Sequence, residues 1–427
     1  MKQKIKTTAV SGFPEYLPAD QLLFDQLKQT VTETYRSFGF IPLDTPVLER
    51  REVLLAKAGG ETEHQIYFLE NNSDDLALRF DLTVPLARYV SEYSGALAFP
   101  FKRYQVAKVY RGERPQKGRY REFYQADIDI IEEGVLPLSA EAEIIKVLAT
   151  VFEKLAIGPF TIKIGNRKLL SGLLASLNLS DSATEILRVL DKLPKIGVEA
   201  CRGELKKIGV DSLTISKILD FASLKDDVLA GLEQLDIKHP DFVIGLGELQ
   251  ELAQCLSDYG VSAANYSFDL SIARGLDYYT GTVWETFLDD YPELGSICSG
   301  GRYDNLVAGF TNRAFPGVGA SIGLSRLFYQ LKTVGLLPAA TPAVVSALVI
   351  SDDRQRGEQL ADSLRRRGLS VAGAYEPEKL KKKLALANRW SVETVYLLGE
   401  EELAANEVSV KDMASGEQKR QPLSDFI

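Results

Sequence analysis

Polar and apolar residues alternate on both sides of a basic loop between Lys108 and Ile130. The alternating segments, VYRGE and EFYQADIDI, are separated by Pro, Gly and several Arg residues. Because alternate side chains of a strand point to the same face, this pattern predicts an antiparallel hairpin. One face of that hairpin would carry Arg111, Glu113, Gln125, Asp127 and Asp129. A face with so many polar side chains does not suit a hydrophobic core. The pattern therefore favours a binding surface.

Apolar residues at helical spacing predict helices elsewhere in the chain. Residues 20–38 form one such segment, with Pro18 before it and Gly39 after it as boundary signals. Residues 139–155 form another, and Pro85 suits the first turn of a helix that follows two strand-like segments, QIYFLE and LALRFD. From residue 166 to 260 the pattern changes to short Leu-rich amphipathic helices, which predicts an inserted helical domain.

Strand patterns return after this helical stretch. The segments FDLSIARGLDYYTGTVWETFL and SICSGGRYDNLV predict strands, and GVGASIGLSRLFYQLKTVG predicts a Gly-rich strand that leads into a helix. Strands and helices then alternate to the C-terminus, which is typical of a small α/β domain. We therefore predict an α+β domain formed by residues 1–165 and 261–333, a helical insertion over 166–260, a linker over 334–342 and an α/β domain over 343–427.

The charge pattern and the small number of histidines limit the ligands and the catalytic mechanisms to be considered. Between Lys102 and Arg121 there are eight basic residues and one acidic residue, Glu113, which favours binding of a polyanion such as a nucleotide or a nucleic acid. The net charge of −9 argues against indiscriminate coating of nucleic acid. The chain contains two histidines, His64 and His239, so that catalytic schemes built on several histidines are excluded. Chemistry should then depend on arginines, carboxylates and positioning.

Cysteine usage and hydropathy indicate the compartment. Cys201, Cys255 and Cys298 lie far apart without a CxxC pair, which disfavours a zinc site or a disulfide framework. No apolar run approaches the roughly 20 residues that span a bilayer, and the first residues lack the apolar stretch of a signal peptide. We expect a soluble, cytoplasmic protein without a membrane partner.

Each candidate motif also has a purely structural interpretation. Arg111 and Glu113 could bind a phosphate and an exocyclic amine, or form an ordinary solvated pair. The segment ARGLDYYTGTVWE could hold a ligand, or form a β-bulge with buried tyrosines. GVGASIGLSRL could pass close to a flat ligand, or serve as a packing strand. SGGRYD lacks the spacing of a phosphate-binding P-loop. KLKKKLALANR could contact RNA, or form a solvated helix face.

Taken together, these motifs resemble the class II aminoacyl-tRNA synthetases, and specifically the histidyl-tRNA synthetase family. FGFIPLDTPVLER resembles motif 1, YRGERPQKGRYREFYQADIDI resembles motif 2, and GVGASIGLSRLF resembles motif 3. ARGLDYYTGTVWE and SGGRYDNLV resemble two signatures peculiar to the histidine-specific family. The resemblance covers almost the whole chain. It implies a catalytic domain of α+β class II synthetase-like fold, with a mixed, mainly antiparallel sheet flanked by helices, and an anticodon-binding C-terminal domain.

The resemblance also implies a role for individual residues in ATP binding and catalysis. Arg111 would hold the α-phosphate and Glu113 the adenine edge. Phe123 would stack on the adenine. Arg119 and Arg326 would bind the outer phosphates. Arg274, with Arg111, would be catalytic, in the place where other class II enzymes have a metal ion.

Histidine and tRNA recognition are implied in the same way. The ammonium group of histidine would be held by Asp81, Thr83 and Gln125, and its imidazole nitrogens by Asp129 and Tyr279. The pocket wall would include Tyr278 and Tyr303, and the tRNA acceptor end would meet Arg114, Gln116 and Lys117. Two features depart from the family: position 325 is Ser where Glu is usual, and Asp81 and Asp129 are shorter than the Glu of many members.

The implied activity is ligation of L-histidine to its tRNA at the expense of ATP, with Mg²⁺ accompanying ATP, no tightly bound metal, and a homodimer formed through motif 1. One alternative is a regulatory paralogue that binds histidine without charging tRNA. Such proteins typically lack the C-terminal domain and the motif 2 arginines, which are present here. A second alternative, an RNA-binding sensor with an inactive fold, would lack the histidine-pocket acids, whereas Asp81 and Asp129 are present.

Overall fold

The computed structural model describes residues 7–56, 63–70, 75–116, 118–190, 192–225, 227–272, 278–338 and 342–427. The chain divides into two compact units. The first contains Leu27–Leu337 and the residues before Tyr16, and the second contains Tyr16–Gln26 and Pro338–Ile427. Among the described residues, no helix is both long and apolar enough to cross a membrane.

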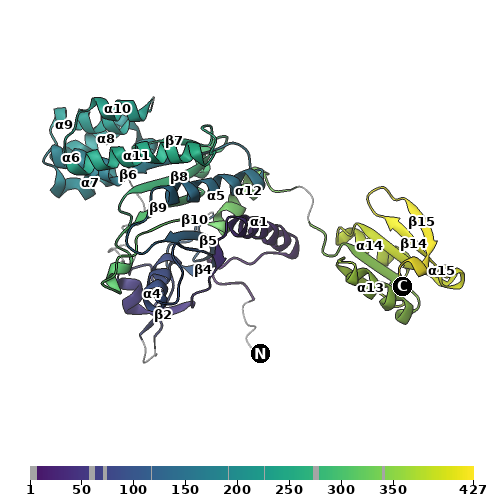
Figure 1. Cartoon of the computed structure of the whole chain (residues 1–427). Helices are drawn as coiled ribbons and strands as arrows, with labels where there is room; N and C mark the ends of the chain where they lie inside the picture. The colour runs from purple at the N-terminus through teal and green to yellow at the C-terminus, as the bar shows by residue number, and fades with distance from the viewer. Residues whose placement is uncertain are drawn as a thin grey trace, which may run out of the picture. The chain divides into compact units, whose positions relative to one another are not determined.

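The first unit is built on a mixed sheet whose eight described strands have the order β1-β4-β5-β10-β9-β8-β6-β7 (Figure 1). The strands are β1 (Ile41–Pro42), β4 (Phe101–Tyr110), β5 (Glu122–Ile131), β6 (Phe160–Asn166), β7 (Tyr266–Phe268), β8 (Thr282–Leu288), β9 (Cys298–Tyr303) and β10 (Gly317–Ile322). Only the outer pairs β1–β4 and β6–β7 are parallel. The predicted mixed, mainly antiparallel sheet is confirmed.

The predicted hairpin is β4 and β5, which pair from Phe101 opposite Ile131 to Tyr110 opposite Glu122. The first strand ends earlier than the sequence suggested, so Arg111 and Glu113 lie in the connecting loop. Beyond the ladder, the backbone amide of Arg111 still donates to the Arg121 carbonyl at 2.9 Å, whereas that of Gly112 points away from β5 and donates to the Gln65 carbonyl at 2.7 Å.

Helices and short strands surround this sheet. They are the part of α1 (Pro18–Ser37) from Leu27 onward, β2 (Leu48–Arg50), α2 (Arg51–Leu55), β3 (Leu76–Leu78), α4 (Thr83–Tyr93), α5 (Ser139–Leu155), η2 (Pro292–Leu294), η3 (Val307–Gly309) and α12 (Leu324–Val334). Helix α5 buries Ile144, Leu148 and Phe152. The segment QIYFLE forms a single bridge, Phe68 with Ala77, rather than the expected strand.

The helical insertion follows β6 and precedes β7, so that both of its connections lie at one edge of the sheet (Figure 1). Its helices are α6 (Arg167–Ser176), η1 (Ser180–Ser182), α7 (Ala183–Leu190), α8 (Leu193–Lys207), α9 (Ser212–Ala222), α10 (Val228–Gln234) and α11 (Pro240–Asp258). Helices α6 and α11 cross closely because Gly172 has no side chain: a Cβ there would lie 2.4 Å from the amide nitrogen of Phe242.

The C-terminal part of the second unit has a five-stranded sheet of order β12-β11-β13-β14-β15 among its described residues. The elements are β11 (Ala347–Ser351), α13 (Arg354–Arg366), β12 (Val371–Ala374), α14 (Leu380–Arg389), β13 (Thr394–Leu398), α15 (Glu400–Ala405), β14 (Glu407–Asp412), β15 (Gln418–Pro422) and η4 (Leu423–Asp425). Alternate residues of β11 join different cores: Val349 packs with Leu360 of α13, and Leu348 packs with Ala387 of α14. The predicted C-terminal α/β domain is confirmed.

Candidate active site

A cavity of about 380 Å³ opens above the central strands of the large sheet. The predicted site residues that line it are Asp81, Thr83, Arg111, Glu113, Arg119, Phe123, Gln125, Asp129, Tyr278, Tyr279, Tyr303 and Arg326. They come from segments distant in sequence, and the fold brings them together. Two predicted residues, Arg274 and Lys117, lie outside the described residues. Arg114 and Gln116 are exposed in the hairpin loop and are not among the lining residues.

Three polar side chains of β5 form the floor of the cavity. Gln125, Asp127 and Asp129 are 8, 2 and 2% exposed. The polar face predicted from the alternating pattern therefore exists, but it is buried and not solvated. The amide of Gln125 donates to the Ser321 hydroxyl on β10 at 2.5 Å.

Side chains from β4 and from β9, which lies beyond β10 in the sheet, hold Asp129. Arg103 lies directly opposite it on β4, and the two side chains form an ion pair at 2.7 Å. On the other side, the Tyr303 hydroxyl of β9 donates to Asp129 Oδ1 at 2.7 Å. Burial raises the pKa of Asp129 to about 7, although Arg103 opposes the shift. Arg103 is fully buried, so its expected part in a basic polyanion-binding surface is wrong.

Two glycines of β10 make room for this arrangement. A Cβ on Gly319 would lie 2.0 Å from Asp129 Oδ1, and a Cβ on Gly317 would lie 2.3 Å from the Tyr303 ring. Both contacts are shorter than any real carbon contact. The glycines of this strand therefore make room for the side chains of Asp129 and Tyr303, as the packing interpretation requires.

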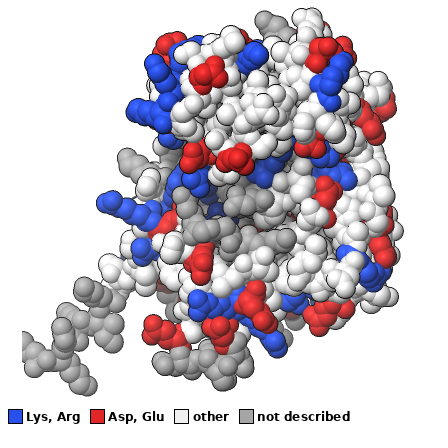
Figure 2. Space-filling model, turned by 90° about the vertical axis from the view of Figure 1, so that its left-hand side faces the viewer, with Lys and Arg blue, Asp and Glu red and all other residues white. Residues whose placement is uncertain are grey.

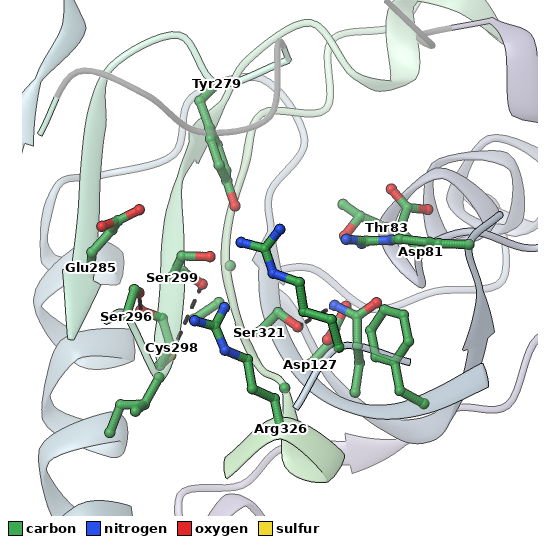
Figure 3. A pocket seen from close by; sticks show the side chains of 18 of the residues that line it. Asp81, Thr83, Asp127, Tyr279, Glu285, Ser296, Cys298, Ser299, Ser321 and Arg326 are labelled. Atoms are coloured by element: carbon green, nitrogen blue, oxygen red, sulfur yellow. Dashed lines mark hydrogen bonds between the residues drawn. The ribbon is translucent and has the colours of Figure 1, made fainter. Parts of the chain in front are cut away.

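Asp81 lies at the start of α4, at the opposite wall from Glu285 (Figure 3). Its Oδ1 accepts the backbone N–H of Val84 at 3.1 Å, in the manner of a helix cap. Burial raises the pKa of Asp81 to about 6, and this hydrogen bond opposes the shift. The side chain can therefore change its charge in the neutral range.

Arginines occupy another part of the cavity. Arg111 Nε donates to the Phe80 carbonyl at 3.0 Å, and its guanidinium lies 5.2 Å from the centre of the Phe123 ring. Arg326 extends from the start of α12 into the cavity (Figure 3) and donates to the Leu294 carbonyl at 3.1 Å. Burial lowers the pKa of Arg326, and the positive charge of Arg119 lowers it further. Such converging guanidiniums favour a bound polyanion.

The three tyrosines form a connected wall. The ring of Tyr278 lies 4.9 Å from that of Tyr279 and 6.0 Å from that of Tyr303. The Tyr279 side chain points into the cavity (Figure 3). The cavity thus joins an aromatic and carboxylate region to an arginine region. On the face drawn in Figure 2, basic and acidic side chains lie close together around a hollow, without one uniformly positive patch.

Ser325, the departure from the family pattern, has a structural role. The side chain is 1% exposed, and its hydroxyl accepts the backbone N–H of Tyr124 at 2.9 Å. This hydrogen bond ties the start of α12 to β5. The hydroxyl thereby helps to fix the position of the adjacent Arg326.

Sequence reasoning assigned no role in the site to several lining residues, namely Asp127, Glu285, Ser296, Cys298, Ser299 and Ser321. Asp127 had a detectable signal, because it shares the alternating face of Gln125 and Asp129. Ser321 lies opposite Asp127 in the strand register, which sequence alone does not give. Burial raises the pKa of the Cys298 thiol, so this cysteine stays protonated.

Comparison with known proteins places the chain in a family. The family model for histidyl-tRNA synthetase matches residues 12–327, and the model for an anticodon binding domain matches residues 343–427. The histidine–tRNA ligase of Clostridium tetani is 46% identical over 432 residues, which cover 100% of this chain and 98% of the relative.

Solved structures agree with this assignment. The histidyl-tRNA synthetase of Nostoc sp. PCC 7120 has a TM-score of 0.91 and 38% identity, covering 99% of this chain and 98% of the other. An ATP phosphoribosyltransferase regulatory subunit/histidyl-tRNA synthetase from Bacillus halodurans C has a TM-score of 0.76 and 23% identity, covering 93 and 99%. The second likeness shows the shared fold alone. From the family model and the C. tetani relative, we conclude that the chain belongs to the histidyl-tRNA synthetase family.

Proposed function

We propose that this chain is a histidine–tRNA ligase whose two chemical steps take place in the cavity above β5. In the first step, a carboxylate oxygen of histidine attacks the α-phosphorus of ATP, and the bond to pyrophosphate breaks. In the second step, a terminal ribose hydroxyl of tRNA attacks the histidyl carbonyl carbon, loses its proton, and AMP leaves. The observation that carries this proposal is the junction of an arginine region and a carboxylate–tyrosine region in one cavity.

The first step needs positioning and charge stabilisation. The nucleophile is already an anion, so that no general base is required. Negative charge grows around the α-phosphorus, and guanidiniums fixed before the reaction stabilise it without reorganising. Arg111 is assigned to the α-phosphate by the family resemblance, and its guanidinium, which Phe80 and Phe123 hold at the cavity wall, supports this role. Arg274 is assigned to the same step by resemblance alone.

The rest of ATP is assigned to the arginine region. Arg119 and Arg326 are assigned to the outer phosphates, since Arg119 is close enough to lower the pKa of Arg326. Phe123 offers a flat face for the adenine, and Glu113 accepts from its amino group. Mg²⁺ bound to ATP would neutralise part of the phosphate charge. Glu285 also lines this region and would offer a carboxylate oxygen, the type of ligand that Mg²⁺ prefers.

The carboxylate–tyrosine region is assigned to histidine. Asp81, Thr83 and Gln125 hold the ammonium group, and Asp129 and Tyr279 hydrogen-bond the two ring nitrogens, with Tyr278 and Tyr303 in the pocket wall. An amino acid without those ring nitrogens would leave buried polar groups unpaired, which costs about 1–3 kcal/mol for each group. Selectivity for histidine then follows from the penalty on other side chains.

The proposed function is tested by measuring ATP–pyrophosphate exchange with each of the twenty amino acids. We expect exchange with histidine alone. Exchange with another amino acid, or binding of histidine without exchange, would refute the proposal. The second outcome would favour a regulatory paralogue. Against that alternative stand the arginines that line the cavity and the anticodon-binding match over residues 343–427.

Histidine affinity should depend on pH through Asp81. Because the pKa of Asp81 is raised to about 6, the carboxylate is mostly protonated at pH 5 and mostly ionised at pH 7. The ionised form is the one that attracts an ammonium group, so affinity should rise about tenfold over this range. The measurement is the dissociation constant between pH 5 and 8, with a histidine analogue whose ring does not titrate there.

The matched variant for this pH dependence is Asp81→Asn, which keeps an oxygen for the Val84 amide but never ionises. The variant should bind the histidine analogue weakly at every pH, and its affinity should no longer change near pH 6. Ionisation of Asp129, whose pKa is raised to about 7, should still change the affinity near pH 7 in both proteins. An unchanged step near pH 6 in the variant would remove Asp81 from ammonium binding.

We assign tRNA contacts to the hairpin loop and to the C-terminal domain. Arg114 and Gln116 are exposed in the loop, and Lys117 follows them in the sequence. In α14, Lys381 and Lys382 are exposed whereas Lys383 is 5% exposed, so that two of the three lysines face solvent. Contacts in two modules strengthen binding through a raised effective concentration.

Deleting residues 340–427 should separate the two steps. The shortened chain should retain histidine-dependent pyrophosphate exchange, because every lining residue of the cavity precedes this segment. It should lose tRNA charging by about tenfold or more, since one of the two tRNA contacts is gone. Both rates are measured beside those of the full chain. Equal loss of both activities would contradict separate roles for the two modules.

We further propose a cytoplasmic homodimer formed through the motif 1 segment. Strand β1 lies at the edge of the large sheet, where Ile41 is 51% exposed. Val47 and Leu48 are 40 and 42% exposed on the same stretch of chain. A run of exposed aliphatic side chains beside an edge strand favours association with a second copy.

A further inference from the structure

We propose that Arg167, the first residue of α6, is a positioning residue that holds Tyr279 in the histidine pocket and so couples the helical insertion to histidine binding. The inference rests on the proposed function, in which Tyr279 contacts the imidazole. Neither the family resemblance nor the alternating strand pattern pointed to Arg167. It emerges from contacts between the insertion and the strand segment that leads into β8.

Arg167 contacts the backbone and the ring of the tyrosine segment. Its Nη1 donates to the Tyr279 carbonyl at 2.7 Å, and its backbone N–H donates to the Gly281 carbonyl at 3.0 Å. The guanidinium carbon lies 5.9 Å from the centre of the Tyr279 ring, within the range of a cation–π contact. One side chain therefore restrains both the chain position and the ring orientation of Tyr279.

The catalytic sheet restrains the same segment from the other side. A Cβ on Gly301 of β9 would lie 2.9 Å from Tyr279 Cδ1, so the ring rests against that glycine. The next residue, Thr280, donates from its backbone to the Arg302 carbonyl at 2.8 Å and from its hydroxyl to Asp304 at 2.6 Å. Tyr279 is thus held between β9 and Arg167. If Arg167 is removed, the contacts with β9 remain to hold Tyr279.

The base of the insertion gives Arg167 a fixed position. Asn166 caps α6 by accepting the backbone N–H of Lys168 at 2.9 Å, and its amide donates to Glu248 of α11 at 2.8 Å. Lys168 forms an ion pair with the same Glu248. Helices α6 and α11 are therefore joined at the point where Arg167 leaves the sheet. A shift of these helices would be transmitted to Tyr279 through one side chain.

The arrangement predicts a selective loss in Arg167→Ala. The Michaelis constant for histidine should rise about tenfold, from the loss of a charge-assisted hydrogen bond and a cation–π contact. The constant for ATP should change less than about twofold, since the contacts of Arg167 lie at the tyrosine wall. Arg167→Lys should recover part of the loss, because an ammonium can donate to the carbonyl but lacks the planar face of a guanidinium.

The matched control is Lys168→Ala, which breaks the ion pair to Glu248 at the same helix end; among the described residues, the Lys168 ammonium pairs with Glu248 and not with Tyr279. Both constants are measured by pyrophosphate exchange on full-length proteins, together with the melting temperature. We expect Lys168→Ala to lower the melting temperature and leave the histidine constant unchanged, because the hydrogen bonds from Asn166 to Glu248 and from the Arg167 amide to Gly281 still hold Arg167 in place. If both variants raise the histidine constant alike, or Arg167→Ala raises the ATP constant equally, Arg167 is merely structural and the inference fails. It also fails if Arg167→Ala changes neither constant.

A third variant, Tyr279→Phe, separates failure of this inference from failure of the proposed function. If Tyr279→Phe leaves the histidine constant unchanged, the assignment of Tyr279 to the imidazole is wrong, whatever Arg167 does. If Tyr279→Phe raises the constant and Arg167→Ala does not, only the positioning role is wrong. Histidine binding should also slow amide exchange in α6 of the wild type, because coupling between two sites is reciprocal. Unaltered exchange in α6 would count against coupling.

Discussion

Replacing Arg111 by alanine should reduce histidine-dependent ATP–pyrophosphate exchange by on the order of 10²- to 10³-fold, the cost of removing one preorganised group that stabilises transition-state charge. Arg111 suits this role because its guanidinium is fixed before any substrate binds. The Phe80 carbonyl holds Nε at 3.0 Å, and the ring of Phe123 lies 5.2 Å away. An arginine already held in place does not have to reorganise as the charge develops.

The matched control is Arg114→Ala, three residues further along the same loop. Arg114 is exposed and does not line the cavity, so its loss should leave exchange unchanged and weaken tRNA charging only. Exchange is measured at saturating histidine and ATP, with the melting temperature as a test of folding. Comparable loss of exchange in both variants would show that the loop needs positive charge in general, and would remove the specific role of Arg111.

The hairpin shows which structural features the sequence pattern predicts and which it does not. Alternation correctly predicted two paired strands and a polar face, because side-chain direction has a period of two along any strand. It did not predict that this face is buried, since burial depends on what the neighbouring strands place above it. Arg103 is the clearest example: it was counted with the other basic residues, yet the register sets it opposite Asp129. A long arginine side chain can pair with an acid or face solvent, and local sequence does not distinguish the two.

The site residues that were missed have a similar explanation. Ser321 and Glu285 reach the cavity from β10 and β8, and nothing in their own segments distinguishes them from ordinary strand residues. Their importance arises from the order of strands in the sheet. The same holds for Ser325, whose value lies in a hydrogen bond to Tyr124, 201 positions away in sequence. Motifs with charge or glycine were recognisable, whereas residues that act through strand register were not.

The acids below the substrate come at a cost in stability. Asp81, Asp127 and Asp129 are all buried, and burial is the largest cause of the raised pKa of each. Raised carboxyl pKa values mean that the folded state binds protons more tightly than the unfolded state. Stability from this source is therefore present at low pH and lost as the pH rises through the folded pKa values, near 6 and 7 for Asp81 and Asp129. The ionised carboxylates, which are the form that binds histidine, therefore stabilise the folded protein least. A bound cationic substrate would offset part of this loss of stability.

Replacing Gly319 by alanine should disrupt the histidine pocket more than the addition of one methyl group would suggest. The added Cβ would lie 2.0 Å from Asp129 Oδ1 and 2.8 Å from the backbone carbonyl of Ile128, which cannot move aside. Asp129 must therefore turn away, which breaks its hydrogen bond with Tyr303 and its ion pair with Arg103. Arg103 would remain as a buried charge without its partner, a severely destabilising state.

We expect Gly319→Ala to raise the Michaelis constant for histidine by on the order of 10²-fold, from two broken polar contacts and the strain of overpacking. The melting temperature should fall as well, and the constant for ATP should change less. The control is Gly247→Ala in α11, where an added Cβ meets nothing within 4 Å. That variant should be as stable as the wild type or slightly more so, since alanine favours a helix by about 1 kcal/mol over glycine. A Gly319→Ala protein with normal histidine kinetics would show that recognition of the imidazole does not depend on the position of Asp129.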